Sequence, residues 1–196
     1  MRSHSPLPFA SSEVEKSPTV TDGVSTALDT NGEGAVAQAK AVKLVGTIAG
    51  IARHARAKGP MEVLDRIGIT IEAGLDGDFR GRVKPGGKGR RQVTLLERGD
   101  WAAAMAEVGA DLPWQDRRAN LLVDGFDLPQ IPGTRLRIGA DVVLEVTRHT
   151  DPCDRMDALA PGLFAALTPD WRGGACTRVL MGGIIAVGDE IRIQEP

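Results

Sequence analysis

The chain has 196 residues and a formal net charge of −2 at pH 7. This length suits one ordinary domain, and the slightly acidic balance argues against a nucleic-acid binder, which needs a cationic surface to release counterions. No stretch approaches the ~20 apolar residues of a membrane-spanning helix, and two cysteines are too few for a disulfide-stapled secreted scaffold. We therefore expect a cytoplasmic protein that binds neither membranes nor nucleic acids.

Residues 1–40 are rich in Ser, Thr, Gly, Pro and Ala. They contain few large apolar side chains to offset the entropy lost on ordering. From Val42 the sequence changes to VKLVGTIAGIA, in which apolar and other residues alternate as in a half-buried strand. These patterns predict a disordered tail over residues 1–40 and one folded domain over residues 41–196.

Short strand candidates then follow one another, separated by Gly, Pro and Asp. They cover residues 67–71, 92–96, 120–123, 134–138, 142–147, 177–181 and 190–193. Two helical windows, at 100–108 and 154–167, interrupt them, and the closing sequence MGGIIAVGDEIRI is typical of strand, turn and strand. Because the strands come in runs, we expect a mainly β protein: a closed or nearly closed antiparallel barrel with a few peripheral helices.

Cys153 lies in VTRHTDPCDRMDAL, between a predicted strand and a predicted helix. The first turn of a helix and the nearby Arg148, His149 and Arg155 favour a thiolate, whereas three neighbouring aspartates oppose it. A thiolate can attack sulfur, carry a persulfide or bind a soft metal. Many cysteines are simply buried, but this charged setting favours a reactive thiol. A Cys153–His149 nucleophilic pair is a minor alternative, because a histidine at this spacing more often faces solvent.

Cys176 leads directly into the apolar strand of GGACTRVL and is expected to pack in the core as a small hydrophobic residue. A disulfide or a shared zinc ion between Cys153 and Cys176 stays open as an alternative. Their spacing matches neither a zinc knuckle nor a CxxC redox pair.

The glycine-rich stretch GRVKPGGKGRRQ, residues 81–92, spreads cations along a loop. Such a loop can bring backbone N–H groups and positive charge to an anion, although a solvated hairpin loop explains it equally well. It is not a P-loop, because Arg82 and Gly89 stand where that motif needs glycine and Ser or Thr. Arg91 directly precedes a predicted strand, so among the cations of this stretch we expect its position to be the most fixed.

Other candidate anion contacts lie in or beside predicted strands: Arg118 just before one and Asn120 at its start, Arg148 directly after another, and Arg178 within a third. Each arginine is also compatible with an ordinary surface charge. Its planar guanidinium binds phosphate or carboxylate at two points, so arginines that converge on a barrel mouth would suit an anionic cofactor.

Several motifs in a fixed order resemble those of one protein family, the molybdenum cofactor sulfurase C-terminal (MOSC) domain family. They are Gly74-Leu-x-Gly77-Asp78, the Arg91-Gln-Val-Thr-Leu-Leu run, Arg118-x-Asn120-Leu, Gly125-x-Asp127-Leu, Thr147…Pro152-Cys153, Arg172-Gly-Gly174 and Arg178-Val-Leu…Gly183…Gly188-Asp189. Each motif alone is weak evidence for the family, but together they span about residues 42–194 in the order found in the family.

The resemblance implies a β-barrel domain that occurs alone in many bacteria and carries one functional cysteine. By motif position that residue is Cys153, which implies a ligand to the molybdenum of a pterin cofactor, as in reductase-type members, or a sulfur-handling thiol, as in sulfurase-type members. The implied cofactor contacts are Arg91, Arg118, Asn120, Arg148 and Arg178. The chain departs from the family at Ala119, where Glu is common, which leaves any role of that carboxylate in question.

Three functions follow as hypotheses. The first is a stand-alone MOSC protein that binds molybdenum cofactor, the enzymatic version of which reduces N-hydroxylated compounds. The second is a non-catalytic persulfide carrier or adaptor that delivers sulfur for metal–sulfur cofactor assembly. The third is a barrel that has lost cofactor binding. The sequence leaves open whether the protein is a molybdenum-dependent oxidoreductase or a sulfur-transfer protein, but each of the first two needs a partner, a redox protein or a cysteine desulfurase.

Overall fold

The computed structural model describes residues 42–194, and the tail predicted over residues 1–40 lies outside this described part. The strands are β1 (Val45–Arg53), β2 (Glu62–Leu64), β3 (Arg66–Thr70), β4 (Gly74–Leu75), β5 (Val93–Glu97), β6 (Leu121–Asp124), β7 (Arg135–Ile138), β8 (Val142–His149), β9 (Ala175–Met181), β10 (Gly183–Ala186) and β11 (Glu190–Ile193). The helices are α1 (Arg98–Val108), α2 (Arg155–Leu159) and α3 (Leu163–Ala166), with 3-10 turns η1 (Trp114–Arg117) and η2 (Pro169–Trp171).

Seven strands form a closed barrel, as the strand pattern predicted. Their order is β11-β7-β8-β9-β5-β6-β1, and β11 pairs again with β1 to close the ring. At this closure Gly46 lies opposite Ile191. On the side of β1 that faces β6, a Cβ at Gly46 would lie 2.4 Å from the carbonyl oxygen of Asp124, so the close approach of these two strands needs glycine. Strand β2 extends the sheet from β1, and β10-β3-β4 form a small second sheet.

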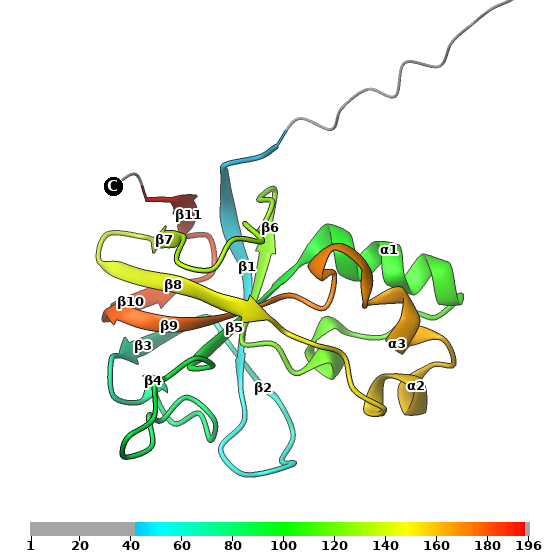
Figure 1. Ribbon diagram of the computed structural model, residues 1–196, viewed down its shortest axis with the longest axis horizontal. Coiled ribbons are helices and arrows are strands. Elements are labelled where there is room, and N and C mark those ends of the chain that lie inside the picture. The colour runs from blue at the N-terminus through cyan, green and yellow to red at the C-terminus, as the bar shows by residue number, and fades with distance from the viewer. Residues whose placement is uncertain (1–41, 195–196) are drawn as a thin grey trace, which may run out of the picture. The chain divides into compact units, whose positions relative to one another are not determined.

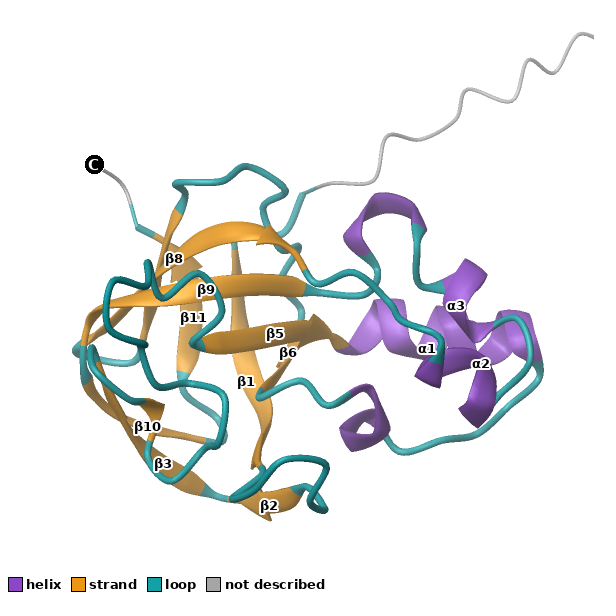
Figure 2. Cartoon of the chain, turned by 60° about the horizontal axis from the view of Figure 1, so that its bottom comes forward, coloured by secondary structure: helices purple, strands orange, loops and turns teal. Residues whose placement is uncertain are grey.

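One pair of barrel strands departs from the antiparallel arrangement that we expected. Strands β5 and β6 are parallel, with Leu95 opposite Leu121. Parallel neighbours need a crossover connection, and here α1 and η1 supply it, because α1 begins at Arg98, directly after β5 ends (Figure 2).

Apolar side chains from alternating strand positions fill the barrel. Leu95, Leu121, Leu144 and Ile191 each have no exposed surface and belong to one continuous cluster. In β7 the residues alternate between outer and buried positions, as a strand with one face on a core requires.

The three helices gather beside one end of the barrel (Figure 1). They pack around a second apolar cluster that includes Met156 and Leu163. Where the sequence predicted a single helix over residues 154–167, the structure has two, because Ala160 precedes a proline and is extended, and Gly162 has a φ of 87°. None of the helices between residues 42 and 194 is long and apolar enough to cross a membrane.

Candidate functional site

Cys153 lies in the loop that joins β8 to α2, and its side chain is exposed. Two backbone bonds fix this loop: the amide of Thr150 donates to the carbonyl of Gly174 (2.8 Å), and the amide of Met156 donates to that of Cys153 (2.7 Å). Cys176 is buried as predicted, and its Sγ lies 3.2 Å from the hydroxyl of Thr150. Cys153 is therefore the thiol that solvent and ligands can reach.

The exposed thiol lines a pocket of about 450 Å³ that is strongly cationic. The pocket is lined by Cys153, Met156, Asp151, Lys58, Arg80, Arg91, Arg117, Arg118 and Arg155. Six cations and one carboxylate thus surround a single cysteine, although the chain as a whole is slightly acidic. Low-dielectric walls with one sign of charge concentrate anions, so the pocket favours an anionic ligand.

Arg117 joins this pocket to the cysteine loop. Its guanidinium is buried, and Nη2 donates to the carbonyls of Thr150 (2.6 Å) and Asp151 (3.4 Å). Burial, and to a smaller extent the charge of Arg91, lower the pKa of Arg117 to about 10, while the neighbouring Cys153 opposes the shift. Arg117 therefore stays charged at neutral pH while it holds the backbone just before Cys153.

Arg118 and Arg91 supply the next two cations. Arg118 ends η1 in the left-handed conformation, with a φ of 61°, and its Nη1 donates to the carbonyl of Gly59 (2.7 Å). Burial lowers the pKa of both arginines. Among the described residues, four guanidinium N–H groups are buried without a hydrogen-bond partner: Arg178 Nε outside the pocket, and Arg91 Nε, Arg117 Nε and Arg118 Nη2 on arginines that line it. Unpaired buried donors are costly, so the three groups on the pocket arginines point to a ligand as the missing acceptor.

Asp151 is the pocket's carboxylate and is already ion-paired. Its side chain lies 3.0 Å from Arg148 Nη1 and 3.3 Å from His149 Nδ1. The ring of His149 stacks on Trp171, with centroids 5.6 Å apart. Burial lowers the pKa of His149, while Asp151 opposes the shift. Arg148 is thus placed beside the cysteine loop but does not line the pocket.

Asn120 lies behind the pocket rather than in its wall. Its Oδ1 accepts hydrogen bonds from the amide (3.0 Å) and hydroxyl (2.8 Å) of Thr94, and its Nδ2 donates to the Ala52 carbonyl (3.2 Å) and Asp78 Oδ1 (3.4 Å). Asp78 also accepts from the backbone and Nδ1 of His54, both at 3.0 Å. This network explains why the Gly77-Asp78 and Arg118-x-Asn120 motifs occur together: it joins the segments that position Arg80 and Arg118.

The structure brings together three of the six residues that the sequence singled out: Cys153, Arg91 and Arg118. Arg178 lies on β9 opposite Glu145, with which it forms an ion pair of 2.9 Å, and does not line the pocket. The list of predicted cofactor contacts left out Arg80, Arg117, Lys58 and Arg155, which also line the pocket. Arg117 could have been found, because it is next to Arg118 just before a buried strand, where one of two adjacent side chains faces inward.

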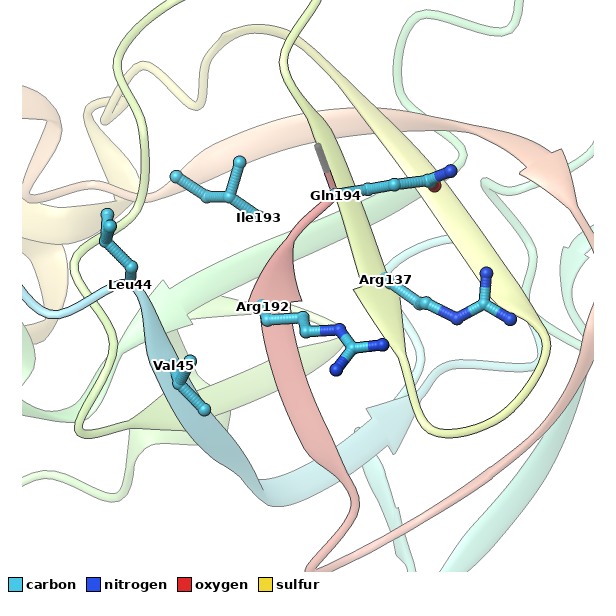
Figure 3. A pocket seen from close by; sticks show the side chains of 6 residues that line it. All are labelled: Leu44, Val45, Arg137, Arg192, Ile193 and Gln194. Atoms are coloured by element: carbon cyan, nitrogen blue, oxygen red, sulfur yellow. The ribbon is translucent and has the colours of Figure 1, made fainter. Parts of the chain in front are cut away.

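A second hollow of about 580 Å³ lies where β1, β7 and β11 meet. Figure 3 shows Leu44, Val45 and Ile193 lining it together with Arg137 and Arg192. Arg192 is paired with Glu190, and Arg137 donates to a backbone carbonyl in its own turn. With apolar side chains and engaged arginines, this hollow offers no reactive group.

Between residues 42 and 194, no three His, Cys, Asp or Glu side chains cluster in a way that could hold a metal ion. The site therefore combines one exposed thiol with a set of arginines. The fold and this site define a class of protein: a small β-barrel with a cationic pocket that contains a single thiol at its surface.

Comparison with known proteins assigns the family. A model of the MOSC domain matches residues 77–192, a range that contains Cys153 and every arginine of the pocket. The chain belongs to the MOSC domain family. No curated protein sequence matches it.

Solved structures share the fold at low sequence identity. YuaD from Bacillus subtilis is 19% identical, with a TM-score of 0.63 over 76% of this chain and 95% of that one. YiiM from Geobacillus stearothermophilus is 15% identical, with a TM-score of 0.57 over 76% of this chain and 75% of that one. YiiM from Escherichia coli is 14% identical, with a TM-score of 0.57 over 76% and 70%. At these sequence identities, the similarity to the solved structures shows a shared fold and nothing more specific.

Proposed function

We propose that this MOSC protein binds an anionic molybdenum–pterin cofactor in the pocket beside Cys153, with the Cys153 thiolate as a ligand to the metal. The observation that carries the proposal is the exposed thiol among buried guanidinium N–H groups that lack partners, on Arg91, Arg117 and Arg118. A thiolate is a soft ligand that suits such a metal, and guanidinium groups bind the phosphate of a pterin at two points.

The residues of the pocket have distinct tasks in this proposal. Arg91 and Arg118 bind the phosphate, and Arg117 holds the cysteine loop through the Thr150 carbonyl. Met156, which is 1% exposed, closes the floor of the pocket against water. When bound, the cofactor supplies two-electron redox chemistry.

The corresponding reaction is the reduction of N-hydroxylated compounds. Each turnover consumes two electrons and two protons: the N–O bond breaks, an N–H bond forms, and the oxygen leaves as water. The electrons come from a separate redox protein, which is the partner that this proposal requires. A cytoplasmic location suits it, because a reducing compartment keeps the Cys153 thiol free.

The cofactor content of purified protein tests the proposal. We expect wild-type protein from a host that makes the cofactor to contain pterin and molybdenum in about equal amounts. Arg91→Gln removes a pocket cation with an unpartnered N–H and is expected to lower the pterin content several-fold, since charged hydrogen bonds contribute about 1.5–3 kcal/mol.

Arg178→Gln is the matched control for Arg91→Gln. It also removes an arginine with a buried, unpartnered Nε–H, but one that lies on β9 outside the pocket and is paired with Glu145. We expect its pterin content to equal that of the wild type. Wild-type protein without pterin, or equal losses in both variants, would contradict cofactor binding at this pocket.

The exposed position of Cys153 also favours a second candidate, a persulfide carrier that receives sulfur from a cysteine desulfurase. The thiolate attacks the outer sulfur of the desulfurase persulfide; a new S–S bond forms on Cys153, and the desulfurase cysteine leaves as a thiolate. Alkylation followed by mass spectrometry after incubation with a desulfurase and cysteine would trap a persulfide on Cys153. If mass spectrometry detects the unmodified thiol at Cys153 and no persulfide, this candidate is excluded.

A further inference from the structure

The segment 79–91 forms a second groove next to the Cys153 pocket. The groove has a volume of about 640 Å³ and is lined by residues 79–80 and 82–85 together with Arg91. Arg80 and Arg91 line both this groove and the Cys153 pocket, so the groove and the pocket are contiguous. The segment carries six Lys and Arg residues and no Asp or Glu, and only Arg80 and Arg91 of these line the Cys153 pocket.

An aromatic side chain is exposed within this groove. Phe79 is 53% exposed, although its amide is fixed by the His54 carbonyl (2.8 Å) and its ring is tilted against the His54 ring, with centroids 6.1 Å apart. Val83 and Pro85 add apolar surface on the same groove. An exposed ring on a fixed backbone offers a surface on which a planar aromatic group can stack at low entropic cost.

Free cations flank this aromatic ring. The side chains of Arg82 and Lys84 form no hydrogen bond or ion pair with another residue of the range 42–194, and both line the groove. The loop that carries them is held by backbone bonds, from the Val83 amide to the Glu72 carbonyl (2.9 Å) and from the Gly87 amide to the Lys84 carbonyl (2.8 Å). The groove thus combines an aromatic surface with positively charged groups that have no partner within the described residues.

We propose that this groove binds a nucleoside monophosphate, with the base stacked on Phe79 and the phosphate held by Arg82 and Lys84. A single phosphate fits better than a triphosphate, because the loop lacks the P-loop residues that cradle several phosphates and magnesium. A simple anion would use the cations but not the ring, and a neutral aromatic would use the ring but not the cations. This site adjoins the proposed cofactor site but uses Phe79, Arg82 and Lys84, which do not line the Cys153 pocket.

Calorimetric titration of the purified protein with AMP, adenosine and ribose 5-phosphate tests this proposal. We expect AMP to bind at least tenfold more tightly than either fragment, because it alone offers both the ring and the phosphate. Phe79→Leu keeps an apolar side chain but loses the stacking surface, and we expect it to weaken AMP binding about tenfold, within the range that stacking contributes. Arg82→Gln, at an exposed position where the fold does not depend on the charge, should weaken AMP binding several-fold.

Lys88→Gln is the matched control, since Lys88 is an exposed cation of the same loop that does not line the groove. Its affinity for AMP should equal that of the wild type. No AMP binding at millimolar concentration, equal binding of AMP and ribose 5-phosphate, or equal losses in Lys88→Gln and Arg82→Gln would overturn the proposal. The titration needs no bound molybdenum, so its outcome is independent of whether the proposed cofactor function holds.

Discussion

At the scale of single residues, the geometry of the site depends on a close approach between two loops. Arg117 reaches the Thr150 carbonyl only because Gly173 leaves room for it. A Cβ at Gly173 would lie 2.5 Å from that carbonyl oxygen, 2.9 Å from Arg117 Nη2 and 3.2 Å from His149 Nε2. The Arg172-Gly-Gly174 motif is therefore part of the site, although neither glycine has a side chain to contribute.

Gly173→Ala is expected to displace the Arg117 guanidinium from the cysteine loop. We expect the free energy of unfolding to fall by about 2 kcal/mol, because a buried charged group then loses its hydrogen-bond partner, and pterin content to fall with it. Urea denaturation and pterin fluorescence of the purified variant measure the two effects.

Gly99→Ala is the control for the loss of a glycine. Gly99 lies in α1, and a Cβ there would meet nothing within 4 Å. Alanine forms helices more readily than glycine, and Gly99 is in the first turn of α1, so this variant should be as stable as the wild type or slightly more so. A Gly173→Ala protein as stable as Gly99→Ala would show that the close approach at Gly173 is unimportant.

At the scale of elements, the cysteine loop is anchored by the short helix that follows it. Met156, in the first turn of α2, belongs to the apolar cluster beneath the helices and also lines the Cys153 pocket. The helix is too short to be stable by itself, so this buried side chain fixes its position and that of the loop before it.

Met156→Ala should therefore destabilise the domain and loosen the site. A cavity at this fully buried position is expected to lower the free energy of unfolding by about 2–4 kcal/mol, and Cys153 should react faster with a thiol reagent. Met181→Ala, at a residue of β9 that is 50% exposed, should change stability by less than about 0.5 kcal/mol. Unchanged thiol reactivity in Met156→Ala would contradict the anchoring role.

At the scale of the whole molecule, the buried His54 and the partly buried His149 are expected to make the protein less stable in acid. Burial lowers the pKa of His54 and of His149 below the usual 6.5, although Asp78 and Asp151 oppose the shifts. The unfolded chain then binds more protons than the folded chain as pH falls through 6.5, so the free energy of unfolding decreases toward lower pH.

Urea denaturation at pH 7.5 and 5.5 measures this loss. We expect lower stability at pH 5.5, and a smaller difference between the two pH values for the double variant His54→Gln, His149→Gln than for the wild type. An equal difference in both proteins would show that other groups cause the acid sensitivity.

Much of the fold could be predicted from the sequence, because barrel strands alternate at each position between core and surface. The strand predicted at 190–193 coincides with β11, whereas β4, with two residues, is too short to show any alternation. Cys153 was found because its charged surroundings and its motif single it out. Arg80 and Lys58 were not, because their loops reach the pocket only through tertiary contacts, and a loop cation in a sequence resembles any surface charge. Arg178 was predicted as a contact, but its pairing with Glu145 depends on the register of β8 and β9.

The ratio of molybdenum to pterin in Cys153→Ala protein tests the proposed role of the thiol most directly. The arginines remain in this variant, so pterin should still bind, whereas the metal loses its protein ligand. We predict about equal molybdenum and pterin in the wild type and a several-fold lower ratio in Cys153→Ala. An unchanged ratio in the variant, or wild-type protein with neither component, would contradict the assignment of Cys153 as the metal ligand.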